Sequence, residues 1–399
     1  MCNLDAIEQT ERWLLALALG EFSLQTLTEQ TAVRLTEAGL PLTRLHVTVR
    51  LLHPIYSGTS VTWTRESGLE QDTYTPADID SDEWRQSPLR HMVENLVFEL
   101  DHCLQDTAEE QPYPLFERLH ASGETGYFGK VTVFGDQATA MEREDGFIAT
   151  WVCDCPGGWQ EDHRDVVRRI QAHMAVAIRQ WVNQQLAENV LTAYIGRDAG
   201  YRVLAGQVRR GDGEDIDAVI WFSDMRSSTR LAESLGRDRF LELLNGFFES
   251  TAGSVESVGG EVLSYIGDSV MAIFSFESFG SPESAAQAAM KAVEKTAESI
   301  GTMNRERVQK NLEPVGYGIG LHVGTVMFGN IGTRTRLNFT VVGSAANVAA
   351  RITDKCRDLK KPMVVSGSFR SLIDRPWIDV GEVELKNVRD PIRLFVLER

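Results

Sequence analysis

Two aspartates, Asp224 and Asp268, each stand where an apolar segment ends. Asp224 closes DAVIWFSD, and Asp268 follows a glycine inside EVLSYIGDSVMAIF, residues 261–274. Apolar residues on both sides of a Gly-Asp pair predict a β-hairpin whose two-residue turn presents one carboxylate. Carboxylates at two strand ends can converge over one edge of a sheet, and such oxygens bind Mg²⁺. Two isolated loop carboxylates are usually just solvated, and the prediction of a divalent-metal site here depends on the residues that follow Asp224.

The residues after Asp224 form a candidate phosphate site. They are Met225, Arg226, Ser227, Ser228 and Thr229, and a helical pattern follows them. A strand-to-helix turn rich in small hydroxyl residues directs free backbone N–H groups and a helix N-terminus outward, where phosphate binds well. Because the formal net charge of the chain is −17, a polyphosphate needs local cations, which two Mg²⁺ ions would supply.

A second polar pair, Asn347 and Arg351, lies in SAANVAARITDKC. Residues four apart lie on one face of a helix. Arg351 could place its guanidinium on a phosphoryl group, and Asn347 could orient a sugar. Spacing alone favours the simpler alternative of N-terminal capping and a surface salt bridge.

The elements that must position these residues predict an α+β fold. Helices would cover one side of a mainly antiparallel sheet. The expected order is strand 217–224, helical segments that stop at Gly259-Gly260, the hairpin, helix 282–311, two strands in YGIGLHVGTVMFGNIG, a strand in NFTVVG and the helix of SAANVAARITDKC.

Four of these segments together resemble the class III adenylate and guanylate cyclase homology domain. FSDMRSST, YIGDSVMAIF, GIGLHVGTVMFGNIG and FTVVGSAANVAAR occur in the family's order, with a weaker tail to the C-terminus. The resemblance implies a ferredoxin-like catalytic domain that cyclises a nucleoside triphosphate and releases pyrophosphate. It also implies two Mg²⁺ or Mn²⁺ ions per site, held by Asp224, Asp268 and the Met225 backbone carbonyl.

The resemblance assigns roles to three further residues. Asn347 matches the residue that positions the ribose, Arg351 matches the arginine that stabilises charge on the reacting phosphate, and Lys386 falls near a lysine that contacts the polyphosphate. In this family one domain supplies the metal aspartates and a second supplies the other residues. One such domain per chain therefore implies a homodimer with two composite sites.

Base selection depends on Ser264 and Thr340 under the same resemblance. Thr340 matches the threonine-using adenylate cyclase subgroup, but Ser264 replaces the usual adenine-binding lysine. Guanylate cyclases usually have a glutamate at that place, and Glu261 is three residues away. On a regular strand an odd separation puts Glu261 on the opposite face, unless a bulge intervenes. We expect ATP as the substrate, with weaker discrimination against GTP than a lysine gives, because neutral hydrogen bonds are weaker than charged ones.

Three regions are expected along the chain: residues 1–161, a GAF-like sensory domain; residues 162–212, a helical linker with a hinge at RRGDGED; and residues 213–399, the cyclase domain. In the first region the pattern predicts a helical stretch over 10–38 that ends at Gly39 and strands at 45–52, 60–64, GYFGKVTVFG and GFIATWVCD. The resemblance to a GAF-type domain is architectural, and the ligand or partner of this region is unknown.

The linker helix, residues 162–194, carries one apolar stripe. The stripe packs either on its own domain or in a parallel dimer seam that transmits a signal, and periodicity leaves both alternatives open. The composite-site requirement favours the seam.

Composition excludes some function classes. The acidic balance argues against general nucleic-acid binding and against an anionic membrane surface. The apolar run WLLALALG is too short to span a bilayer, and no basic segment typical of a signal peptide precedes it. Five cysteines without zinc-ligand spacing indicate reduced thiols and a cytoplasmic protein.

The leading hypothesis is an adenylate cyclase whose output is set by its N-terminal domain. One alternative is a catalytically silent nucleotide-binding regulator, which the missing lysine favours and the retained aspartates oppose. Others are a cyclase of relaxed ATP/GTP selectivity and a protein whose main role is ligand binding by the N-terminal region.

Overall fold

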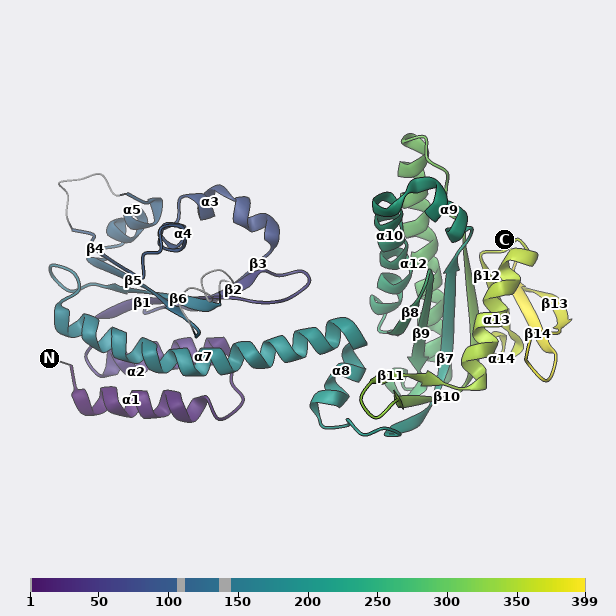
Figure 1. The fold of residues 1–399 in the computed structure, drawn as a ribbon, viewed down its shortest axis with the longest axis horizontal. Helices are drawn as coiled ribbons and strands as arrows, with labels where there is room; N and C mark the ends of the chain where they lie inside the picture. The colour runs from purple at the N-terminus through teal and green to yellow at the C-terminus, as the bar shows by residue number, and fades with distance from the viewer. Residues whose placement is uncertain (1, 106–111, 136–144, 399) are drawn as a thin grey trace. The chain divides into compact units, whose positions relative to one another are not determined.

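Two compact units, Met1–Val190 and Leu191–Arg399, make up the chain in the computed structural model. The structure describes residues 2–105, 112–135 and 145–398. Each unit contains its own sheet and helices (Figure 1). The mixed α+β class expected from the sequence is confirmed, and each unit is described by itself below.

A six-stranded antiparallel sheet organises the first unit, in the order β3-β2-β1-β6-β5-β4. Its strands are β1 (Leu42–Arg50), β2 (Gly58–Thr64), β3 (Gly68–Tyr74), β4 (Glu99–Cys103), β5 (Gly126–Val133) and β6 (Gly146–Cys153). The predicted strands at 45–52 and 60–64 are confirmed as the pair β1 and β2, because Leu45 lies opposite Trp63. Alternating apolar residues turn one face of this sheet into the buried core of the unit.

The N-terminal helical stretch is two helices, not one. They are α1 (Leu4–Leu17) and α2 (Leu24–Glu37). The stretch breaks because Ser23 caps α2 by accepting a hydrogen bond from Thr26 N, a signal that the apolar periodicity across 10–38 concealed. Short helices cover other parts of the unit: η1 (Pro76–Asp80), α3 (Asp82–Arg85), α4 (Pro88–Glu94) and α5 (Pro114–Ala121).

The apolar stripe of α7 (Glu161–Ile195) divides at Trp181. Up to that residue the stripe is buried in the core of the first unit, through Val167, Ile170, Met174, Ile178 and Trp181. Beyond it, Val190 is 38% exposed and Tyr194 is 85% exposed. The first part therefore packs on its own domain, while the second part presents apolar side chains to solvent.

The second unit is built on a larger sheet in the order β13-β14-β12-β10-β7-β9-β8, with β11 paired to β10. Its strands are β7 (Gly213–Met225), β8 (Glu261–Ile266), β9 (Ser269–Ser275), β10 (Tyr317–Gly332), β11 (Leu337–Val342), β12 (Met363–Ser366), β13 (Trp377–Val383) and β14 (Ile392–Leu397). The predicted hairpin is confirmed as β8 and β9. Its turn is Gly267-Asp268, and Gly267 has the left-handed φ of 63° that such a turn needs.

Helices cover both faces of this sheet, which corrects the expectation of one helical side. Trp221 and Phe274 pack with α12 (Pro282–Gln309) on one face, whereas Ile220 and Ile273 pack with α13 (Ser344–Asp358) on the other (Figure 1). The remaining helices are α8 (Arg197–Leu204), α9 (Ser228–Leu235), α10 (Arg237–Glu256), α11 (Phe276–Phe279) and α14 (Gly367–Arg370).

One continuous strand, β10, replaces the two strands expected in YGIGLHVGTVMFGNIG. It pairs with β7 from Tyr317 opposite Met225 to Gly329 opposite Gly213. Its glycines leave room for a helix rather than a turn, since a Cβ at Gly320 would lie 2.4 Å from Thr353 Oγ1 on α13. The same pairing places residues 213–215 of the expected hinge in β7.

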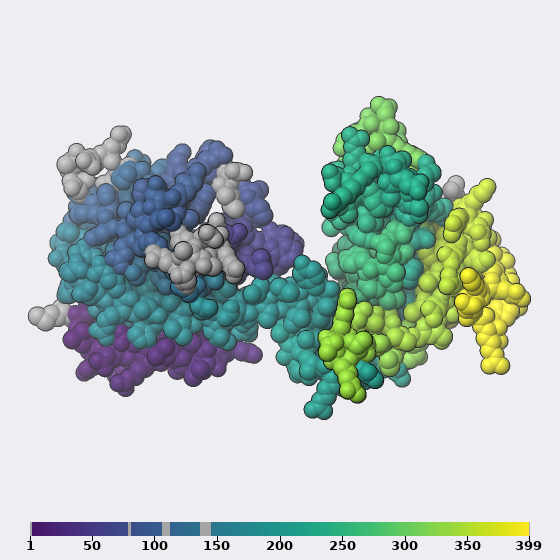
Figure 2. Space-filling model, viewed as in Figure 1, coloured from purple at the N-terminus to yellow at the C-terminus, as the bar shows by residue number. Residues whose placement is uncertain are grey.

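A space-filling view shows the surface of each unit from one side (Figure 2).

In the part of the chain that the structure describes, none of the helices combines the length and apolar character that crossing a membrane requires.

Candidate functional site

The two aspartates lie at the same edge of the sheet of the second unit. Asp224 is the penultimate residue of β7 and pairs with Ser269, the residue directly after Asp268. The Met225 amide also donates to the Asp268 carbonyl oxygen at 3.4 Å. The hairpin therefore brings the Asp268 backbone to the end of β7.

Burial and neighbouring carboxylates act on Asp224. The pKa of Asp224 rises from 3.8 to about 6, chiefly because the carboxyl is buried and then because Asp268 and Asp354 repel its charge. The guanidinium groups of Arg357 and Arg226 oppose this rise without cancelling it. A divalent cation bound here would relieve that repulsion, so the donor set fits a hard metal ion.

Backbone and substrate oxygens would have to complete such a coordination shell. Among residues 2–105, 112–135 and 145–398, no three His, Cys, Asp or Glu side chains are placed to hold a metal ion. The Met225 backbone is adjacent, and a bound polyphosphate offers further oxygens, which Mg²⁺ commonly uses.

The turn after β7 leaves the start of α9 open. Ser227, the N-cap, has a left-handed φ of 60°, and its side chain makes no capping hydrogen bond. A non-glycine residue in this conformation is unfavourable and is often found at functional sites. The first N–H groups of α9, at Ser228 and Thr229, are therefore without a capping side chain, which is the arrangement that binds phosphate.

Arg226 forms hydrogen bonds with the backbone near the end of α13. Its Nη2 donates to the carbonyl oxygens of Cys356 at 2.8 Å and Lys361 at 2.6 Å. A half-buried guanidinium held by two carbonyls fixes the β7–α9 turn against the end of α13. Arg226 therefore supports the site through the backbone, and its contact with phosphate stays a prediction.

Asn347 and Arg351 share the outer face of α13. The inner face packs on the sheet through Val348, Ala349 and Ile352. Asn347 is exposed, and Arg351 Nη1 donates to Asp354 Oδ2 at 3.1 Å in a half-exposed pair. Such a pair contributes little stability, so the guanidinium is available to a stronger anion.

The structure does not bring Asn347 to the carboxylates of its own chain. A Cβ at Gly318 would lie 3.0 Å from Asp224 Oδ1 and 3.0 Å from Cys356 Cβ, so the Asp224 carboxylate lies at the level of Cys356. Asn347 is nine residues before Cys356, a distance of roughly 14 Å along a helix. Asn347 and the Asp224 carboxylate of one chain are therefore separate from each other along α13.

A β-bulge in β8 changes the predicted faces of Ser264 and Glu261. Glu261 pairs with Ile273 and Ser264 pairs with Met271, with a register shift between Val262 and Ser264. Because residues two apart on β9 share a face, Glu261 and Ser264 also share a face. The expectation that they lie on opposite faces is wrong, because the extra residue restores the alternation.

Burial affects both side chains on this face. Ser264 Oγ is buried without a hydrogen-bond partner. The pKa of Glu261 rises from 4.5 to about 7, first through burial and then through repulsion by Asp198, while Arg202 opposes the rise. Glu261 can therefore exist as a neutral acid near neutral pH.

The positions of Thr340 and Lys386 say less about a role in the site. Phe339 and Val341 point into the buried cluster on the α13 face, so Thr340 points to the opposite face of β11. Lys386 is exposed in a turn between β13 and β14, next to the buried Leu385. The structure shows neither side chain in contact with the aspartates.

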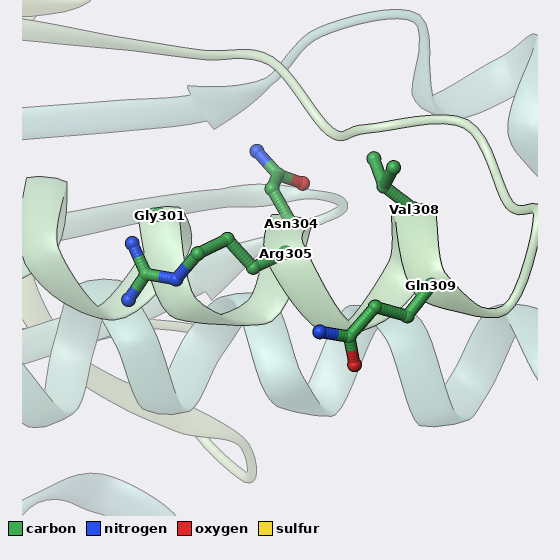
Figure 3. Close-up of a pocket in the computed structure, with 5 residues that line it drawn as sticks. All are labelled: Gly301, Asn304, Arg305, Val308 and Gln309. Atoms are coloured by element: carbon green, nitrogen blue, oxygen red, sulfur yellow. The ribbon is translucent and has the colours of Figure 1, made fainter.

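A shallow hollow on α12 is unrelated to these residues. It is lined by Gly301, Asn304, Arg305, Val308 and Gln309 (Figure 3). Asn304 is engaged in the fold, because it exchanges hydrogen bonds with the Val315 backbone. The candidate site is therefore the sheet edge, where sequence reasoning missed Asp354, whose partner role no motif marks.

Known protein families and individual proteins match the second unit. The family model described as "Adenylate and Guanylate cyclase catalytic domain" matches residues 213–399. An uncharacterized protein of Mycobacterium tuberculosis is 30% identical over 209 residues, covering 50% of this chain and 37% of its own length. An adenylate cyclase of Anabaena cylindrica is 32% identical over 138 residues, covering 34% of this chain and 26% of its own. The chain thus spans well under half the length of these relatives.

Solved structures also match this unit. The adenylyl cyclase CyaB from P. aeruginosa is 24% identical with a TM-score of 0.42, covering 47% of this chain and 97% of its own. The guanylyl cyclase Cya2 is 24% identical with a TM-score of 0.40, covering 46% of this chain and 92% of its own.

Proposed function

We propose, on the premise that residues 213–399 of this chain are an adenylate and guanylate cyclase catalytic domain, that the protein converts ATP to 3′,5′-cyclic AMP and pyrophosphate. The observation that carries this proposal is the convergence of Asp224 and Asp268 beside the open N-terminus of α9. A carboxylate pair next to a phosphate seat suits in-line attack of the 3′-hydroxyl on the α-phosphorus.

Each residue has a limited task in this reaction. Asp224, Asp268 and the Met225 carbonyl would hold two Mg²⁺ or Mn²⁺ ions, which lower the pKa of the 3′-hydroxyl and neutralise charge on the phosphate oxygens. The backbone N–H groups at Ser228 and Thr229 would bind the polyphosphate.

We call the carboxylate edge one half-site, and the residues below the other half-site, which would position the substrate. Asn347 would orient the ribose, Arg351 would leave Asp354 for the charged phosphate, and the exposed Lys386 would approach the polyphosphate. Ser264 and Thr340 would contact the base.

The separation of the half-sites supports a homodimer. Asn347 lies roughly 14 Å along α13 from the level of Asp224. A partner chain would supply Asn347 and Arg351 to the aspartates of the first chain, giving two composite sites. We place the enzyme in the cytoplasm, with its output set by a GAF-like N-terminal domain of unknown ligand.

The bulge in β8 favours GTP as a second candidate substrate. It places Glu261 on the face of Ser264. An ionised carboxylate accepts two hydrogen bonds, which matches the donors on the Watson–Crick edge of guanine. Adenylate formation stays the first candidate, because Ser264 itself is uncharged and Glu261 is beside Asp198 and Arg202 of α8.

Product formation tests the proposal directly. Purified full-length protein would be incubated with ATP or GTP and with Mg²⁺ or Mn²⁺, and the products separated by chromatography. We expect cyclic AMP as the main product and its loss in Asp224→Asn. Nucleotide binding without any cyclic product would instead support the silent regulator.

A further inference from the structure

Two thiols in the first unit approach each other within contact distance. Cys153, the last residue of β6, and Cys155 have their Sγ atoms 3.3 Å apart. Cys153 is fully buried, whereas Cys155 is partly exposed. Two thiols in contact, one of them reachable from solvent, can be oxidised to a disulfide with little movement.

The surrounding backbone is shaped to hold this pair. Gly126 of β5 lies opposite Cys153, and a Cβ there would be 3.0 Å from the Cys153 Sγ and 2.9 Å from Gly158 Cα. Thr125 Oγ1 donates to the carbonyl oxygens of both Cys153 and Cys155, at 3.0 and 2.6 Å. The glycine leaves room for the sulfur atoms, and the threonine fixes the backbone on either side of residue 154.

The pair also takes part in the turn that leads into α7. The Cys155 thiol donates to the Gly158 carbonyl oxygen at 2.9 Å. Gly157 and Gly158 have left-handed φ values of 79° and 76°, so this turn depends on glycine. Conversion to a disulfide removes the S–H donor and leaves the Gly158 carbonyl with the longer hydrogen bond from Gln160 Nε2, at 3.3 Å.

A metal site explains these thiols less well. Zinc in structural sites takes four ligands. In the described ranges of the chain, no third metal-ligating side chain joins Cys153 and Cys155 in an arrangement that could hold an ion.

We propose that Cys153 and Cys155 are a redox-sensitive dithiol that a hydroperoxide converts to a disulfide. The hydroperoxide oxidises the partly exposed Cys155 thiol to a sulfenic acid and is itself reduced to an alcohol, or to water if the oxidant is hydrogen peroxide. The Cys153 sulfur then attacks the Cys155 sulfur; the S–S bond forms, the S–O bond breaks, and water leaves with the thiol proton. Residues two apart close a small ring, and strained disulfides of this kind are readily reduced again.

Thiol trapping and mass spectrometry of the full chain test the proposal. Protein treated with hydrogen peroxide would be alkylated and digested, and the peptide with residues 153 and 155 examined. We expect this peptide to lose two alkylatable thiols and two hydrogen atoms, and dithiothreitol to restore both. Cys356, buried in the second unit with its thiol 3.3 Å from the Ile319 carbonyl oxygen, is the matched control and should stay alkylatable after unfolding.

Variants separate this pair from the exposed Cys103, whose strand partner is also Gly126. In Cys103→Ser the Cys153–Cys155 disulfide should still form, and in Cys155→Ser it should be lost while circular dichroism shows an unchanged fold. A disulfide from Cys103 to either cysteine as the main product would overturn the proposal. Two free thiols after peroxide would do the same, whatever the cyclase activity.

Discussion

The carboxylate edge of the second unit and the outer face of α13 are built in opposite ways. At the edge, Asp224 is partly buried and Asp268 is held by a tight hairpin, so like charges are forced together. On α13, Asn347 and Arg351 are carried by a rigid helix and point outward, where Arg351 pairs with the adjacent Asp354. In the first region, repulsion between carboxylates would be relieved by a bound cation. The second region presents hydrogen-bond donors that suit an anion. Asn347 lies roughly 14 Å along α13 from the level of Asp224, and we propose that neither region completes a site alone.

Complementation of two inactive variants tests whether each active site takes residues from two chains, and it has the largest expected effect. Asp224→Asn removes a proposed metal ligand. Arg351→Ala removes the proposed charge stabilisation, whose loss commonly costs on the order of 10²–10³-fold in rate. Each homodimer should be nearly inactive. Mixed dimers should carry one intact site, so an equimolar mixture allowed to exchange should recover about a quarter of wild-type activity.

The control for this mixture pairs two lesions of the same half-site. Asp224→Asn mixed with Asp268→Asn leaves every metal half damaged, so activity should stay absent. Recovery in this control, or none in the first mixture, would break the composite-site model.

Manganese affinity should depend on pH through Asp224. Its pKa of about 6 exceeds the ordinary 3.8, so the carboxyl is protonated below pH 6 and cannot bind a cation. We expect Mn²⁺ affinity to fall about tenfold for each pH unit below 6. Electron paramagnetic resonance of free Mn²⁺ between pH 5 and 8 measures this.

The variant Asp354→Asn sharpens the measurement. It removes one carboxylate that raises the pKa of Asp224. The midpoint of Mn²⁺ binding should therefore move to lower pH, while Asp379→Asn, remote from this edge in the sequence and paired with Arg393, should leave it unchanged. Affinity that is flat over this pH range would show that Asp224 does not hold the ion.

Substitution Ser264→Lys addresses the base rather than the metal. A charged donor contributes more than a neutral hydroxyl, by about 1.4 kcal/mol, which corresponds to about tenfold. We expect the ratio of kcat/KM for ATP to that for GTP to rise by this factor. Ser264→Ala is the control without a charged donor, and it should cost little stability because the native hydroxyl already lacks a hydrogen-bond partner. An unchanged ratio in the lysine variant would place residue 264 away from the base.

Sequence patterns predicted the elements better than their edges. The hairpin tip at Asp268 was predictable, because Gly-Asp between apolar runs has few other solutions. The bulge before Ser264 was not, because it depends on the register with Met271 and Ile273 of a neighbouring strand. The contacts of Arg226 with the carbonyls of Cys356 and Lys361, more than a hundred residues away, were likewise not predictable. Local periodicity contains no information on such contacts between distant segments.

The smallest expected effect concerns Glu261 and the second candidate substrate. Its pKa of about 7 means that the side chain changes from a neutral acid to a carboxylate between pH 6 and 8. The carboxylate only accepts hydrogen bonds, so it favours the donors of guanine, and relative GTP turnover should rise about threefold with pH, within the range of one neutral hydrogen bond. Glu261→Gln cannot ionise and should flatten this dependence. Asp198→Asn removes a repulsive charge, lowers the pKa of Glu261 and should move the rise to lower pH. A rise that persists unchanged in Glu261→Gln would mean that the bulge serves the packing of α8 on the sheet and not the choice of nucleotide.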